Sequence, residues 1–138
     1  MSNLKTILIV DDDEGIRFVF SNILEKSGYE VVEAENGAKA LEVLSEIATP
    51  VLIITDINMP KMNGYKLLAK IKGDPSLSTV PIAICSLENH AEDIAALIGA
   101  GYFKKLATPE DFLKQVEAEI AKNEESSPLF AEKAANKQ

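Results

Sequence analysis

The 138-residue sequence lacks the features that mark secreted and membrane proteins. It contains a single cysteine, Cys85, so no disulfide can form within the chain, which suits a reducing compartment. Its apolar runs are only a few residues long, far short of a membrane span, and no signal-peptide core follows Met1. We therefore expect a soluble, cytoplasmic protein that does not bind membranes, with Cys85 buried as a small apolar side chain.

Basic residues are few relative to acidic ones. Fourteen Lys and Arg residues stand against 22 Asp and Glu residues, which gives a formal net charge of -8. Such a surface would be repelled by a phosphate backbone, which argues against a nucleic-acid-binding role. Apolar residues make up 46% of the chain, enough for the core of one compact domain, and nothing indicates a second domain.

Short apolar runs alternate with segments of helical period, a pattern typical of βα units around a parallel sheet. The runs at 7–10 and 51–54 are continuous, as expected of central strands buried on both faces, and further strands are predicted at 31–32, 80–85 and 102–105. The intervening segments predict five helices, of which the last would carry Phe112, Val116 and Ile120 inward. The apolar residues at helical spacing in the other four are Ile16, Val19, Phe20, Ile23 and Leu24; Ala40, Leu41, Leu44 and Ile47, on one face; Leu67, Leu68 and Ile71; and Ile94, Leu97 and Ile98.

Three helix boundaries carry recognisable signals. Ser27-Gly28 would end the first helix with a left-handed glycine, and Thr49-Pro50 would end the second. Thr108-Pro109 would begin the last helix with an N-cap and an N1 proline. Beyond about Lys122 the periodicity ends, so we predict a domain over residues 1–122 and a polar, flexible tail over 123–138, with a docking spot at Leu129-Phe130.

Polar residues follow four of the predicted strands. In an open parallel sheet the carboxyl ends of the strands form one crevice, which would bring together Asp11, Asp12, Asp56, Ser86 and Lys105. Three crowded carboxylates require a cation, and a hard, oxygen-preferring ion such as Mg²⁺ (or Mn²⁺) fits them. A carboxylate beside such an ion can attack phosphorus, which would form an acyl phosphate on Asp56.

Lys105 and Ser86 would complete that chemistry. The ammonium group can pair with one phosphoryl oxygen, and the hydroxyl group can donate to another. Taken singly, each signal is weak, because an aspartate at a strand end is commonly a helix cap and a lysine is commonly a surface residue. The ordered set supports the hypothesis of a phosphoryl-accepting site.

Two segments of the chain resemble a known family. Residues 7–13, Ile-Leu-Ile-Val-Asp-Asp-Asp, and residues 55–64, Thr-Asp-Ile-Asn-Met-Pro-Lys-Met-Asn-Gly, are similar to the receiver domains of response regulators in two-component signalling, of the chemotaxis-type single-domain kind. The resemblance covers residues 5–122. It implies a flavodoxin-like, doubly wound sheet of five parallel strands in the order 2-1-3-4-5, with helices on both faces.

The resemblance also implies a role for each site residue. By position, the phosphoacceptor would be Asp56; the metal ligands Asp12 directly, Asp11 mostly through water, Asp56 and the backbone carbonyl of Asn58; the essential lysine Lys105; the hydroxyl switch Ser86; and the aromatic switch Tyr102. From the residues alone, Tyr102 is equally well a core tyrosine.

The chain departs from the family pattern near this site. Leu87 stands where a very small residue is usual, so we expect it to modulate the rates of phosphotransfer or hydrolysis. Leu106 replaces the usual proline after the lysine, which predicts a trans peptide bond and a rearranged loop. The segment 86–105 is short, which predicts a trimmed fourth helix, and Lys104 could exchange roles with Lys105 if the register slipped by one residue.

The leading hypothesis is a phosphorylation-dependent switch in a phosphorelay. It would be loaded by a histidine kinase or phosphotransfer protein, would then bind a downstream protein target, and would be a monomer or a phosphorylation-dependent dimer. The alternative is a degenerate receiver that acts as a constitutive interaction domain. A metal-dependent phosphatase needs a second acid near the nucleophile, where this chain has Asn58. The isolated His90 is interpreted as a surface residue without a role.

Overall fold

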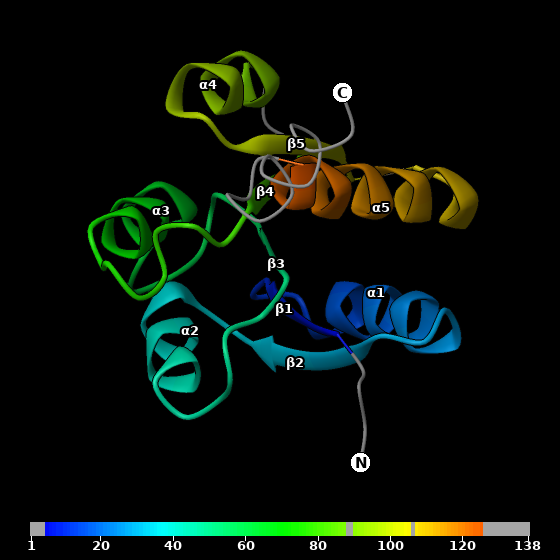
Figure 1. Cartoon of the computed structure of the whole chain (residues 1–138), viewed down its shortest axis with the longest axis horizontal. Coiled ribbons are helices and arrows are strands. Elements are labelled where there is room, and N and C mark those ends of the chain that lie inside the picture. Colours follow the sequence, from blue (N-terminus) through cyan, green and yellow to red (C-terminus); the bar gives the residue numbers. More distant parts are fainter. Residues whose placement is uncertain (1–4, 88–89, 106, 126–138) are drawn as a thin grey trace, which may run out of the picture.

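A computed structural model of the chain describes residues 5–87, 90–105 and 107–125. Within these residues, five strands and five helices alternate (Figure 1). The strands are β1 (Thr6–Val10), β2 (Glu30–Ala34), β3 (Leu52–Thr55), β4 (Ile82–Ser86) and β5 (Gly101–Lys104). The helices are α1 (Glu14–Lys26), α2 (Gly37–Leu44), α3 (Gly64–Lys72), α4 (Ala91–Ile98) and α5 (Pro109–Glu125).

The strands form a single parallel sheet in the order β2-β1-β3-β4-β5. This is the doubly wound, flavodoxin-like arrangement that the resemblance implied, and the prediction is confirmed. The central strands are buried along their whole length, which explains why their sequences are continuously apolar rather than alternating.

Helices cover both faces of the sheet (Figure 1). Ile7 and Ile9 of β1 pack in one core cluster with residues of α1 and α5. Leu8 and Val10 point to the opposite face and pack with residues of α2 and α3. Because successive side chains of a strand alternate between faces, one short strand supplies both cores. A third cluster holds α4 through Ala91 and the strand residue Ile84.

Several predicted helix boundaries are confirmed. Gly28 follows α1 with a φ of 95°, a left-handed conformation that glycine adopts without strain. The Thr108 hydroxyl oxygen accepts a hydrogen bond from the Asp111 amide at 3.2 Å and so caps α5, which begins at Pro109. Asp13, Asn36 and Asn63 cap α1, α2 and α3 in the same way.

The predicted length of the second helix is wrong. Helix α2 ends at Leu44, so Ile47 lies beyond it rather than on its inner face. The Ser45 hydroxyl donates a 2.6 Å hydrogen bond to the carbonyl oxygen of Glu42. Serine side chains that bond nearby backbone carbonyls compete with the helical pattern, which accounts for the early end.

In two helices, some of the apolar residues that predicted the helix are exposed. In α4 the buried residues are Ala91 and Ala95, whereas Leu97 is 85% and Ile98 39% exposed. Ala91 and Ala95 pack with Ile57 and Ile84 in the third core cluster. In α1, Val19 is 52% exposed, because the apolar stripe of this helix is wider than the face that packs on the sheet.

Three segment boundaries need smaller corrections. Strand β4 begins at Ile82 rather than residue 80, because Pro81 has no amide hydrogen to donate to a neighbouring strand. Strand β5 covers 101–104, so Lys105 follows the strand instead of ending it. Helix α5 extends past Lys122 to Glu125. The predictions for Leu106 and for the tail with Leu129-Phe130 fall outside the described residues.

None of the helices within 5–87, 90–105 and 107–125 combines the length and the apolarity needed to cross a bilayer.

Candidate phosphoryl-accepting site

Two aspartates lie side by side where the central strands end. Val10 of β1 is paired with Thr55 of β3, so Asp11 and Asp56, each one residue further, leave the sheet at the same level. The Asp56 amide donates to the Val10 carbonyl at 2.9 Å, and the Asp11 amide donates to the Ala34 carbonyl at 3.1 Å. The register of the sheet therefore sets the position of both acids.

The Asp56 carboxylate is held in one orientation. Its Oδ1 accepts a 2.8 Å hydrogen bond from the Ile57 amide. Its Oδ2 lies 3.1 Å from the Lys105 ammonium, and the side chain is 11% exposed. One oxygen is thus fixed by the backbone, while the other pairs with Lys105.

The loop after Asp56 folds back beneath it. The Gly64 amide donates to the Ile57 carbonyl at 2.9 Å, and a Cβ atom on Gly64 would overlap the carbonyl oxygen of Asp56. Only glycine permits this approach. Asn58 lies within the loop and is exposed.

Lys105 joins the two strand-end acids. Its Nζ lies 3.1 Å from Oδ2 of Asp11 and 3.1 Å from Oδ2 of Asp56, and its side chain is 10% exposed. Burial by itself would lower the pKa of Lys105, but hydrogen bonds and charge attraction from the two carboxylates outweigh it, and the pKa is raised. The lysine is therefore a fixed positive charge in the pocket.

The third acid, Asp12, lies at the exposed side of the pocket. One carboxylate oxygen from each of Asp11, Asp12 and Asp56 lies within 4.8 Å of the others. Burial raises the pKa of Asp11 by more than the Asp13 amide and Lys105 lower it. Three carboxylate oxygens this close together fit a hard divalent cation, because such ions are bound by several oxygen ligands at once.

Strand β4 contributes a buried hydroxyl group to the same edge of the sheet. Ser86 ends this strand and is 2% exposed. Its carbonyl oxygen accepts a 3.1 Å hydrogen bond from the hydroxyl of Tyr102 on β5, whose ring packs against the α4 cluster. A serine at the strand end is thereby linked to an aromatic ring on the neighbouring strand.

Comparison with known proteins decides what this arrangement is. The model of the response regulator receiver domain matches residues 7–118. The chain belongs to this family. It is 34% identical over 122 residues to the chemotaxis protein CheY1 of Helicobacter pylori, which covers 86% of this chain and 98% of that protein. It is 38% identical over 107 residues to the two-component response regulator ORR5 of Oryza sativa, covering 78% and 75%.

A solved receiver structure supports the same conclusion. The response regulator protein TrrA of Thermotoga maritima, in complex with Mg²⁺ and BeF, matches with a TM-score of 0.73 at 27% identity, covering 83% of this chain and 98% of that one. As a receiver, this chain is a phosphorylation-dependent signalling switch, a phosphoacceptor rather than an enzyme with a turned-over substrate. Its family pairs it with a histidine kinase.

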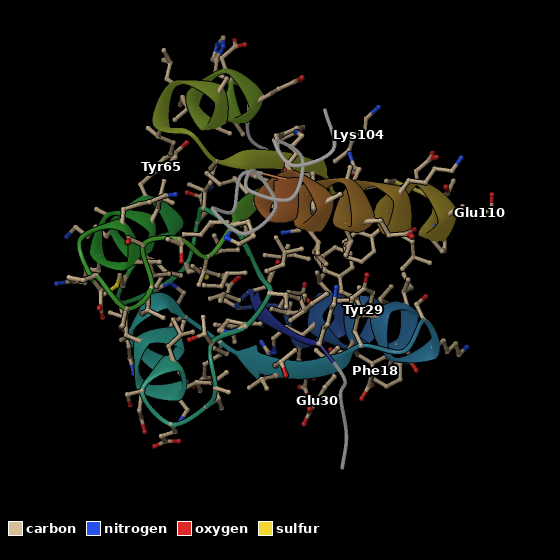
Figure 2. The ribbon with its side chains drawn as sticks, viewed as in Figure 1. Phe18, Tyr29, Glu30, Tyr65, Lys104 and Glu110 are labelled. Carbon is tan, nitrogen blue, oxygen red and sulfur yellow. The ribbon has the colours of Figure 1, made fainter. Side chains whose placement is uncertain are left out.

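An apolar groove opens beside the receiver's acidic pocket. It measures about 420 Å³ and is lined by Asp13, Gly15, Ile16, Val19, Phe20, Leu87 and Lys105. Leu87 is 65% exposed, so its side chain lies at the rim of the groove rather than inside the pocket. Phe18, which precedes Val19 on α1 and is labelled in Figure 2, is 66% exposed.

The two adjacent lysines point in different directions. Lys104 is exposed and labelled in Figure 2, whereas Lys105 reaches the two carboxylates. His90 precedes α4 with an 80% exposed side chain, in agreement with its interpretation as a surface residue. Cys85 is 1% exposed, as expected.

Sequence reasoning missed two residues that shape the receiver pocket. Gly64 stands out in the sequence only as the last residue of the 55–64 segment, and its contact with Asp56 depends on a fold-back that spacing does not reveal. Arg17 was not singled out, although it donates to the Asp11 carbonyl. Its one visible signal is that it is the chain's single arginine, close after the acidic run.

Proposed function

We propose that Asp56 is the residue that receives the phosphoryl group. The observation that carries the proposal is the contact of its Oδ2 with Lys105 in a pocket that also holds Asp11 and Asp12. With its Oδ1 held by the Ile57 amide, the carboxylate is oriented for in-line attack. The new bond joins Asp56 oxygen to phosphorus while the P–N bond of a phosphohistidine donor breaks and the imidazole takes up a proton.

Mg²⁺ or Mn²⁺ would be held by Asp11, Asp12, Asp56 and the Asn58 carbonyl oxygen. Such an ion offsets the negative charge of the incoming phosphoryl oxygens. Lys105, already placed between Asp11 and Asp56, would pair with one phosphoryl oxygen. The Mg²⁺ and BeF complex of the similar TrrA protein supports the choice of ion.

Ser86 and Tyr102 would report the phosphorylated state to the surface. Movement of the Ser86 hydroxyl toward the phosphoryl group shifts the carbonyl that holds the Tyr102 hydroxyl, and the ring packs on the α4 cluster. The populations of two arrangements of α4 and β5 would thereby change, and with them the affinity for a downstream protein. The active form would be a monomer or a phosphorylation-dependent dimer.

The donor would be a histidine kinase or phosphotransfer protein in the cytoplasm. The apolar groove, with Val19 and Leu87 at its surface, opens beside Lys105 and gives such a donor apolar area next to the reacting carboxylate. Leu87 at the rim would also limit the access of water, so a Leu87→Ala variant should lose its phosphoryl group faster.

The test is intact mass after incubation with acetyl phosphate and Mg²⁺. We expect one phosphoryl adduct that requires the metal, is absent from Asp56→Asn and is abolished by a chelator. Asp74→Asn, which removes the charge of a half-buried aspartate outside the acidic cluster, is the matched control and should be phosphorylated normally. An adduct on Asp56→Asn would assign another acceptor, and no adduct in any sample would favour a constitutive interaction domain.

A further inference from the structure

Arg17 contacts the 11–13 segment through both its backbone and its side chain. Its amide donates to the Asp13 carbonyl at 3.1 Å. Its Nη1 donates to the Asp11 carbonyl at 2.6 Å, and its Nε donates to Oε1 of Glu33 at 3.1 Å. The Arg17 side chain is 14% exposed and its bond to the Asp11 carbonyl is partly buried, whereas the Glu33 side chain is 41% exposed.

The contacts of Arg17 complete the anchoring of the two peptide groups that flank Asp11. On one side of Asp11, the amide is bonded to the Ala34 carbonyl of β2. On the other side, Arg17 holds the Asp11 carbonyl, which belongs to the peptide plane that leads into Asp12. A peptide is planar, so fixing that carbonyl fixes the direction in which the next residue leaves.

The direction of Asp12 matters because its carboxylate completes the acidic cluster. Asp11 is also fixed by its own side chain, which accepts from the Asp13 amide at 2.9 Å and pairs with Lys105. Asp12 is exposed and reaches within 4.8 Å of the other two carboxylates. The orientation of the peptide before it is therefore the chief restraint on where its oxygens lie.

The charge of Arg17 does not explain its position. A positive charge near a cation site lowers the affinity for the cation, by Coulomb's law. Glu33 pairs with the guanidinium and offsets that charge. The pocket keeps its negative character while the planar guanidinium contributes two directed hydrogen bonds, one to each acceptor.

We infer that Arg17 is a positioning residue for the divalent cation, acting through the Asp11 carbonyl on the orientation of Asp12. The inference rests on the proposed cation site. Groups that orient metal ligands in this way typically change metal affinity by about 10- to 100-fold when they are removed.

The test is the affinity for Mn²⁺, measured by the loss of the free-ion EPR signal. Arg17→Met removes both donors and keeps an apolar stem, and it should bind Mn²⁺ about tenfold more weakly than wild type. Arg17→Lys keeps the charge but lacks the planar guanidinium donors, so its affinity for Mn²⁺ should lie between those of wild type and Arg17→Met. Lys39→Met is the matched control, because Lys39 lines the same surface hollow as Arg17 and Glu33 but pairs with Glu42 instead.

The sign of the change separates positioning from charge. If charge alone mattered, Arg17→Met would bind Mn²⁺ as tightly as wild type or more tightly, and that result would overturn the inference. A wild-type protein that binds no Mn²⁺ would overturn the proposed cation site first. With saturating Mg²⁺, phosphorylation of Arg17→Met should return to the wild-type rate, and a rate that stays low would assign Arg17 a different role.

A second readout follows from Arg17 being the only arginine in the chain. Its Nε–H group should give a single resonance in an NMR spectrum of arginine-labelled protein. We expect that resonance to shift on titration with Mg²⁺ in wild type and to stay unshifted in Asp12→Asn. If the wild type binds Mg²⁺ but this resonance does not shift, the proposed link between Arg17 and the cation site is contradicted.

Discussion

Single residues decide whether the pocket of this receiver can form. Gly64 has no room for a side chain, since a Cβ atom would overlap the carbonyl oxygen of Asp56. Lys105 must reach two acids that leave different strands. These contacts join residues that are separated along the chain, so a substitution at Gly64 or Lys105 changes the surroundings of the Asp56 carboxylate.

Gly64→Ala tests the contact beneath Asp56. The added methyl group must displace backbone, so we expect a loss of about 2 kcal/mol in the free energy of unfolding, as for other overpacked sites. Slower phosphorylation should accompany it. Gly73→Ala is the matched control, because Gly73 ends α3 with a φ of -81° that alanine adopts readily. Chemical denaturation measures both, and equal stabilities would contradict the described fold-back.

Cys85 should be inert in the native protein. Burial raises the pKa of its thiol to about 12, and the side chain is 1% exposed. The thiol therefore stays protonated well above pH 8, and the reactive thiolate is scarce. We expect negligible alkylation by iodoacetamide at pH 8 to 9, and complete alkylation in denaturant. Rapid labelling of the folded protein would show that the sheet opens at β4.

At the scale of elements, aromatic packing joins the two helices on one face. Phe112 of α5 stacks on Phe20 of α1 with ring centroids 4.6 Å apart and meets the edge of Phe103 on β5 at 6.0 Å. These three rings connect α1, α5 and the edge strand in one cluster. The cluster fixes α5 against the strand that precedes Lys105.

Phe112→Ala should therefore destabilise the protein strongly. Removal of a 2% exposed phenylalanine ring typically costs about 3 to 5 kcal/mol. Phe18→Ala on α1 is the control, since that ring is 66% exposed and its loss should change stability by less than about 0.5 kcal/mol. Thermal and denaturant unfolding compare the two, and similar losses would argue against the cluster as the link between the helices.

The elements also show how far the sequence predicts the structure. Strand order, the positions of Asp11 and Asp56 and the burial of Phe112, Val116 and Ile120 followed from pattern and resemblance, because continuous apolar strands and strand-end acids are local signals. The buried face of α4 did not, because which side of a short helix packs on the sheet depends on the assembled fold. The larger apolar residues Leu97 and Ile98 are exposed, and the small residues Ala91 and Ala95 are buried.

The end of α2 and the contacts of Arg17 could not be predicted from the sequence either, because both depend on hydrogen bonds to backbone carbonyls. Ile47 continues the helical period, but the hydroxyl of Ser45 ends the helix before it. Arg17 contacts a backbone carbonyl, and such contacts leave no pattern of residue types in the sequence. Spacing predicts which face a side chain occupies, whereas its hydrogen-bond partners depend on the assembled fold.

At the scale of the whole molecule, cation binding should be linked to stability. The chain carries a formal net charge of -8, and three carboxylates converge in one pocket. A ligand that binds only the folded state stabilises it by mass action, so Mg²⁺ at ten times its dissociation constant should add about 1.4 kcal/mol. Thermal melts at matched ionic strength in NaCl separate this effect from screening. Asp12→Asn should lose most of the gain, and an equal gain in that variant would place the ion elsewhere.

The bridge made by Lys105 has a consequence for the order in which the protein is made. Asp11 and Asp56 leave the ribosome well before Lys105, which lies just after the last strand. A nascent chain that stops before β5 therefore carries the acids without their ammonium counter-charge and without the edge of the sheet. The pocket is completed only once Lys105 has been added, so the acids of a shorter nascent chain lack the positive charge that pairs with both of them.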